Sequence, residues 1–152
     1  MKFRKMIPIF ALIIVCLIIY IATLTQQSDS EIEGLPLNIL KKDILSTQAT
    51  KSTYTRTDKQ VNIGSEQVHL DENTKTEIIK HLNSLTTGDV TNVNNTEGSV
   101  IFGIAFKFQN QSEIRVQYTS NDTYLTKIGK DTYRYKVQNK ELSDILDTLS
   151  KD

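Results

Sequence analysis

The chain has very few of the residues from which proteins build cross-links and metal sites. Its 152 residues include no tryptophan, two histidines (His69 and His81) and one cysteine, Cys16. One cysteine excludes a disulfide within the chain. Zinc sites need three or four ligands, mostly cysteine and histidine at short spacing, and the two histidines lie twelve positions apart with no second cluster. We therefore expect a domain that relies on its apolar core, without a metal or cofactor.

The motifs of several enzyme classes are also missing. There is no G-x-S-x-G, no S-x-x-K with its companion motifs, no P-loop and no G-x-G-x-x-G. The segment that begins at Asp71 fails as an EF-hand loop, because Thr76 stands where glycine is needed and Leu82 where glutamate is needed. The sequence thus predicts no catalytic residue. A serine–histidine pair or two carboxylates brought together by the fold remain an alternative.

Acidic residues are missing from the beginning of the chain. All 18 of them lie after position 28, whereas Lys2, Arg4 and Lys5 precede a long uncharged run. Without these three, 15 of the 18 basic residues face 18 acidic ones, which is a net charge of −3 beyond residue 24. That balance excludes a strongly basic protein that binds nucleic acid.

The uncharged run covers residues 6–24. As a helix, its 19 residues would extend about 28 Å, close to the ~30 Å hydrocarbon core of a membrane. Basic residues precede the run and Asp29, Glu31 and Glu33 follow it, which predicts a cytoplasmic N-terminus. The prediction is therefore a cytoplasmic tail over residues 1–5, a single-pass anchor in the cell membrane over 6–24, and an external remainder.

A cleaved signal peptide is the alternative, with cleavage after Ala22 or Thr25. The apolar stretch is longer than in an ordinary signal peptide, and no A-x-A pattern stands near its end. A lipoprotein site is disfavoured as well, because Val15 precedes Cys16 where a small residue is expected. These points favour an uncleaved anchor.

Residues 25–40 are polar and acidic and contain Gly34 and Pro36, which is typical of a linker. Residues 41–152 carry the patterns of an external folded domain. Strands are predicted over 44–50 and 51–57, and a short hairpin is predicted around Gly64-Ser65.

The clearest strand covers residues 99–108, where the even positions are all apolar and are expected to face the core. Three more alternating segments follow, which predicts a four-stranded antiparallel meander over 99–137. Apolar residues at helical spacing predict helices over about 72–87, capped by Asp71 or Thr74, and about 140–150, capped by Asn139. The expected fold is an α+β domain whose mainly antiparallel sheet is covered by both helices on its apolar face.

The alternation in these strands also predicts a basic sheet face. If Phe106, Val116, Tyr124 and Tyr135 face the helices, five basic residues face outward against Glu113. These residues are Lys107, Arg115, Lys127, Arg134 and Lys136. Such a face is expected to contact an anionic envelope polymer, lipid headgroups or a protein partner, and the alternative is a solvated surface.

In layout the chain resembles small membrane-anchored or lipoprotein-like extracytoplasmic proteins of bacilli and related Gram-positive bacteria. The resemblance rests on the basic start, the single anchor, the acidic linker and the small domain without cysteine. It favours a membrane-tethered, non-catalytic binding or accessory domain. The alternatives are a cell-envelope hydrolase with a fold-assembled site, and an immunity or inhibitor protein for a toxin that acts at the membrane.

Overall fold

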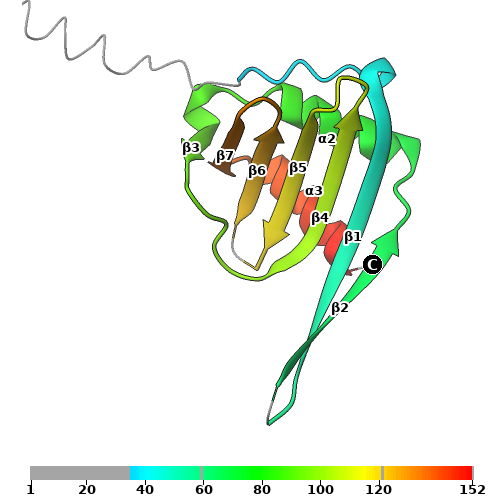
Figure 1. The fold of residues 1–152 in the computed structure, drawn as a ribbon, viewed down its shortest axis with the longest axis vertical. Helices are drawn as coiled ribbons and strands as arrows, with labels where there is room; N and C mark the ends of the chain where they lie inside the picture. The colour runs from blue at the N-terminus through cyan, green and yellow to red at the C-terminus, as the bar shows by residue number, and fades with distance from the viewer. Residues whose placement is uncertain (1–34, 59, 121, 152) are drawn as a thin grey trace, which may run out of the picture. The chain divides into compact units, whose positions relative to one another are not determined.

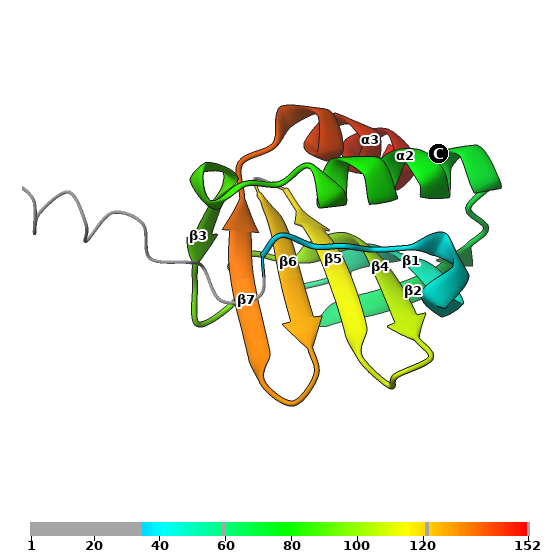
Figure 2. The same cartoon turned by 90° about the horizontal axis from the view of Figure 1, so that it is seen from above.

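Seven antiparallel strands form one sheet, and two α-helices lie together on one of its faces (Figures 1 and 2). The structure is a computed structural model that describes residues 35–58, 60–120 and 122–151. The predicted α+β class and the placement of both helices on one face are confirmed. The predicted tail, anchor and first part of the linker lie outside the described residues. Among those it describes, no helix has the length and apolar character needed to cross a membrane.

The strands stand in the order β2-β1-β4-β5-β6-β7-β3. In chain order the elements are η2 (Lys41–Asp43), β1 (Ile44–Arg56), β2 (Val61–Val68), α2 (Glu72–Asn83), η3 (Thr87–Asp89), β3 (Val90–Asn92), β4 (Val100–Phe108), β5 (Glu113–Thr119), β6 (Thr123–Ile128), β7 (Thr132–Val137) and α3 (Lys140–Lys151). The last four strands are consecutive neighbours, which confirms the predicted meander. β1 and β2 extend it beyond β4, and the short strand β3, which was not predicted, pairs with β7.

The first hairpin differs from the prediction. β1 is one strand of 13 residues rather than two, and the chain turns between Thr57 and Gln60, where the Thr57 N–H donates to the Gln60 carbonyl. The predicted turn at Gly64-Ser65 is wrong, because Gly64 lies inside β2 opposite Thr53. A Cβ at Gly64 would lie 2.5 Å from Thr53 Oγ1, so this glycine permits close packing across the strands.

Both helices begin at side-chain caps. Asp71 accepts from the N–H groups of Asn73 and Thr74, so Asp71 rather than Thr74 caps α2. Asn139 accepts from the Leu142 N–H at 2.9 Å, as predicted for α3. The predicted end of the first helix near residue 87 is wrong. The helix ends at Asn83 with Ser84 as its C-cap, and the Ser84 hydroxyl donates to the His81 carbonyl at 2.8 Å, which satisfies one of the last carbonyls of the helix.

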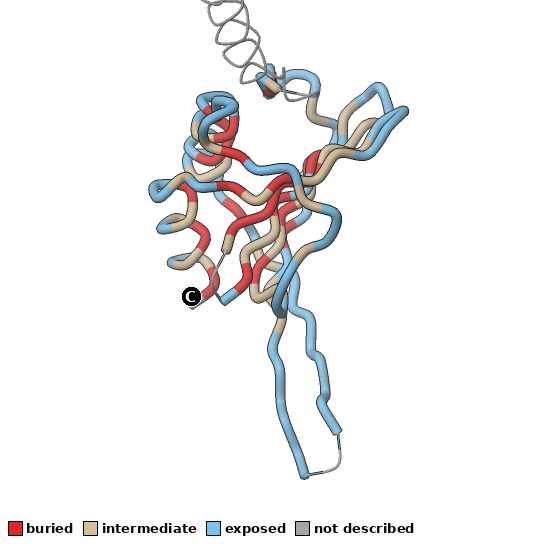
Figure 3. The backbone as a smooth tube through the Cα atoms, turned by 90° about the vertical axis from the view of Figure 1, so that its left-hand side faces the viewer, coloured by how far each residue is buried: buried red, intermediate tan, exposed pale blue. Residues whose placement is uncertain are grey.

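The core lies between the sheet and the helices (Figure 3). The even positions Phe102, Ile104 and Phe106 of β4 are buried, which confirms the predicted inward face. Leu37 and Ile39 are also buried, so the folded domain includes residues that the sequence assigned to the linker. Apolar burial at 37 and 39 outweighs the polar composition around them.

The distal part of the β1–β2 hairpin projects beyond the rest of the sheet (Figures 1 and 3). β1 pairs with β4 only as far as Lys51, opposite Phe102, whereas its pairing with β2 continues to Arg56. Residues 52–65, here named the arm, therefore form a two-stranded extension. Every described residue in it beyond Ser52 is exposed.

Candidate functional site

The pairing of the strands decides which side chains share a face of the sheet. Ala105, Arg115, Thr126 and Arg134 follow one another across four strands, so they lie on one face. This is the open face, since the helices cover the face that carries Phe106. Lys107 and Lys136 share the open face by the same register. Four of the five predicted basic residues are therefore brought to one surface.

Lys127 is the exception to the predicted basic face. It stands opposite Ile114 on one side and Tyr133 on the other, which places it on the helix-covered face. Tyr124 accordingly lies on the open face, contrary to the prediction. The reason is that Leu125, not Tyr124, packs into the main core, and successive apolar residues in β6 made the phase of the alternation ambiguous.

The open face is partly covered by the connection from β3 to β4. Arg134 Nη1 donates to the Asn94 carbonyl at 2.7 Å, and Thr96 Oγ1 lies 3.3 Å from Gln117 Oε1. These contacts hold residues 93–99 against the open face. Tyr124 in this part of the face is only 1% exposed. β6 is thus buried on both of its faces.

Most of the basic residues on the open face are already engaged within the domain. Arg115 forms an ion pair with Glu113, and the hydrogen bond from Arg115 lowers the pKa of that carboxyl. Lys136 Nζ lies 2.7 Å from Asp122 Oδ1, and the hydrogen bond that Lys136 donates to this carboxylate raises the pKa of the lysine. Arg134 is bound to a backbone carbonyl, and Lys107 is exposed. The face is therefore less positive than the sequence suggested.

The open face is hollowed over the middle of β4. Gly103 and Ala105 form the floor of a groove of about 270 Å³, because neither carries a side chain that could fill it. Its rim combines amide, hydroxyl and cationic groups from β1, β4 and β5 with the carboxylate of Glu113, which is paired with Arg115. The amide, hydroxyl and cationic groups belong to Gln48, Thr50, Lys107, Arg115 and Gln117.

The fold does not require glycine at position 103. A Cβ there would make only ordinary contacts, the nearest being 3.6 Å from Thr50 Oγ1. Glycine weakens a strand interior, and it often marks a place where a ligand or another backbone approaches closely. The groove over Gly103 is therefore the strongest candidate binding surface on the open face.

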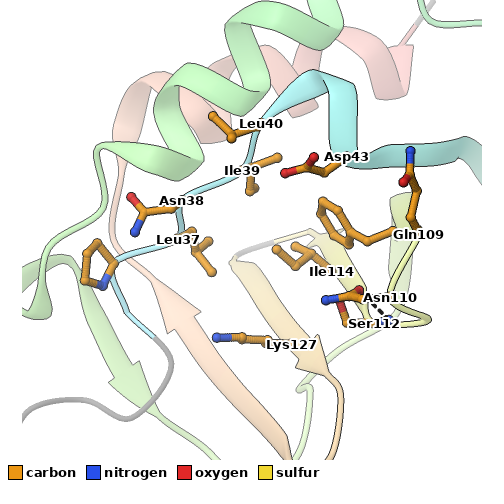
Figure 4. Close-up of a pocket in the computed structure, with 12 residues that line it drawn as sticks. Leu37, Asn38, Ile39, Leu40, Asp43, Gln109, Asn110, Ser112, Ile114 and Lys127 are labelled. Atoms are coloured by element: carbon orange, nitrogen blue, oxygen red, sulfur yellow. Dashed lines mark hydrogen bonds between the residues drawn. The ribbon is translucent and has the colours of Figure 1, made fainter.

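A second cavity, of about 350 Å³, lies between residues 36–40 and the end of the sheet at the β4–β5 turn (Figure 4). Leu37, Phe108 and Ile114 supply apolar surface, and Lys127 lines it from β6. The lysine that the sequence assigned to the basic face thus contributes to a separate hollow on the other side of the sheet.

Among the described residues, neither histidine shares a cavity with a carboxylate in the way that a catalytic pair would require. His69 lines a hollow of about 290 Å³ together with Thr47 and Lys75, but no carboxylate lines that hollow. No group of three or more His, Cys, Asp or Glu residues able to hold a metal occurs in the part of the chain that the structure describes. Where the pKa of a carboxyl group is lowered, the cause is a structural contact. Asp71 and Asp89, for example, accept hydrogen bonds from Thr74 and Thr86 as part of helix caps.

The arm carries exposed apolar residues that the sequence reasoning did not assign to a site. Tyr54 lies directly opposite Ile63, and Val61 is on the same face of the arm. Their exposed fractions are 41%, 68% and 57%. The alternation of Val61 and Ile63 with polar residues is the available signal, but the sequence predicts only a short hairpin there and no binding surface.

Comparison of the chain with protein-family models, with curated proteins and with solved structures finds no match.

Proposed function

We propose that the chain is a membrane-tethered, extracytoplasmic, non-catalytic binding domain that holds a partner in the groove over Gly103. The tether is the apolar run over residues 6–24 that the sequence predicts as an anchor. The observation that carries the proposal is a groove whose floor has no side chain at Gly103, although the fold has room for one there. A flat floor with a polar rim fits an extended segment of a partner chain.

The charges around the groove favour a protein partner over a polyanion. Arg115, Arg134 and Lys136 are engaged with groups of the domain itself, so a polymer with many phosphates would have to break these contacts. Lys107 is exposed at the end of the groove and suits a single carboxylate. The amides of Gln48 and Gln117 suit the backbone groups of an extended peptide.

The proposal is tested by filling the groove. Gly103→Val places a β-branched side chain on the floor, where the first added carbon has room, and valine suits a strand. Thr132→Val introduces the same side chain at an exposed position of the same face, at the far end of β7 and away from the groove. Cross-linking and capture from membranes with the intact protein should identify partners that Gly103→Val loses and Thr132→Val retains.

Loss of capture by Gly103→Val supports the proposal only if that variant unfolds at a denaturant concentration close to that of the wild type. Lys107→Glu provides an independent check, because it reverses the exposed charge without touching the groove floor. If the wild type, Gly103→Val and Lys107→Glu capture the same partners equally well, the groove is not the binding site.

A further inference from the structure

The two edges of the sheet are protected very differently. β3 forms one edge and has only three residues, which is one of the ways in which proteins limit pairing at an edge. β2 forms the other edge and has eight residues, Val61–Val68, in continuous register with β1. It contains no lysine or proline, and Glu66 is its single charged residue. The outer edge of β2 is therefore open to an additional strand.

The arm adds an apolar contribution to this open edge. Tyr54 and Ile63 form a cross-strand pair, and Val61 stands two residues from Ile63 on the same face. An exposed edge strand with such residues is a site of pairing with another chain. A strand added there would extend the sheet and place its side chains beside Val61 and Ile63 on the same face.

We propose that the added strand is β2 of a second copy of this chain, paired antiparallel with Ile63 opposite Ile63 of that copy. Most homodimers have a two-fold axis. Such an axis perpendicular to the sheet brings the β2 edges of the two copies together in antiparallel direction. The pairing creates a row of Tyr54, Ile63, Ile63 and Tyr54 across four strands. The second copy supplies an apolar row that matches in both position and face.

The charges distinguish this register from its neighbours. With Ile63 at the centre, Glu66 faces Gln60 of the other copy, and Val61 faces Ser65. A shift of the centre to Asn62 would pair Val61 with Ile63, but it would carry Glu66 past the end of the other β2 toward Asp58 in the turn, where the two like charges repel. A shift to Gly64 would place Ile63 opposite Ser65 and separate the apolar rows. The Ile63-centred pairing avoids both penalties.

The inference uses the tether of the proposed function but not its groove. Two copies anchored in one membrane meet at a raised effective concentration, which strengthens a contact of modest area. The arm and the groove involve different residues, so a variant of one leaves the other intact. Ile63→Lys should abolish the pairing of two copies but keep capture of a partner in the groove. Gly103→Val should abolish this capture but keep the pairing.

Disulfide trapping tests the register in the full chain with Cys16→Ser as background. Opposite residues in an antiparallel pair have Cα atoms about 4.5–5.5 Å apart, within reach of a disulfide. Ile63→Cys should therefore form a covalent dimer of twice the 17.3 kDa chain mass in liposomes under mild oxidation. Val61→Cys alone should not form one, but Val61→Cys combined with Ser65→Cys should.

Leu45→Cys is the matched control, because Leu45 is 71% exposed but lies in β1 outside the arm. Equal cross-linking by Leu45→Cys and Ile63→Cys would overturn the proposal. A second measurement avoids cysteine: the Cys16→Ser chain should be dimeric in detergent at high concentration, Leu45→Lys should stay dimeric, and Ile63→Lys should be monomeric. A monomeric parent chain, or a dimeric Ile63→Lys variant, would also overturn it.

Discussion

The side chain of Asn83 binds both backbone polar groups of Ile39. Asn83 Oδ1 accepts from the Ile39 N–H at 2.8 Å, and Asn83 Nδ2 donates to the Ile39 carbonyl at 2.9 Å. The two residues are 44 positions apart, so this clamp fixes residues 35–40 to the end of α2. It also positions Leu37 and Ile39 in the core.

Replacement of Asn83 by alanine should release this clamp. We expect Asn83→Ala to lower the free energy of unfolding by about 1–3 kcal/mol, since both backbone groups of Ile39 lose their partners. Asn73→Ala is the control, because Asn73 is exposed in the first turn of the same helix. Faster hydrogen exchange at Ile39 in Asn83→Ala alone would support the clamp, and identical exchange in both variants would contradict it.

Two adjacent residues of β4 test the assignment of the sheet faces. Phe106 is fully buried against the helices, whereas Lys107 is exposed on the open face. Phe106→Ala should cost about 3–5 kcal/mol in unfolding free energy. Lys107→Ala should stay within about ±0.5 kcal/mol. Urea unfolding measures both, and equal losses would show that the faces are reversed.

The cap of α2 should make the stability depend on pH in the acid range. Hydrogen bonds from Thr74 and Asn73 lower the pKa of Asp71 in the folded chain. Its stabilising contribution is therefore complete above the ordinary aspartate pKa of about 3.9, and it is lost as the pH falls through the lower folded value. Asp71→Asn retains a capping side chain but cannot titrate, so its unfolding free energy should fall less steeply with acid.

Asp58→Asn is the control for this titration. It removes the same carboxyl group from the exposed tip of the arm, where no helix begins. Urea midpoints of the wild type and both variants between neutral pH and the acid range provide the comparison. If the urea midpoint of Asp71→Asn falls with acid as steeply as that of the wild type, the Asp71 cap is not a source of the pH dependence.

Arg134 is expected to act in folding more than in binding. Its guanidinium holds the Asn94 carbonyl, so Arg134→Ala should loosen residues 93–99 and cost about 0.5–1.5 kcal/mol. Arg115→Ala removes an equal charge from the same face but leaves the 93–99 contacts in place. Hydrogen exchange over 93–99 should rise only in Arg134→Ala. A similar rise in both variants would argue against a specific role for Arg134.

The membrane prediction has a direct test in cells. Trypsin added to intact, wall-stripped cells should cut the chain within the arm, because Arg56 is exposed next to the turn. Because Lys59 is a second trypsin site in the arm, Arg56→Gln combined with Lys59→Gln should reduce this cut while cleavage elsewhere continues. Full protection of the wild type would contradict the predicted orientation. A mature N-terminus at Thr23 or Gln26 would show that the apolar run is a cleaved signal peptide.

Local sequence was sufficient for the elements whose two faces differ strongly in polarity or whose ends carry a clear signal. The α3 helix follows from its apolar spacing and from Asn139 as its cap. The inward face of β4 follows from phenylalanine and isoleucine at alternate positions, opposed by the small residues Gly103 and Ala105. In these segments the period and the phase of the pattern agree, so neighbouring residues fix the outcome.

Contacts between distant residues decided the remainder. β6 is buried on both faces, so its alternation gave the period but not the phase, and only the pairing with β5 and β7 placed Lys127 inward. The arm is exposed, so no buried stripe marked it, and a glycine that packs against Thr53 resembled a turn. The groove combines residues of β1 and β4 that lie more than 50 positions apart. Sequence determines local periodicity, whereas register, which sets the shared faces and the grooves, depends on long-range pairing.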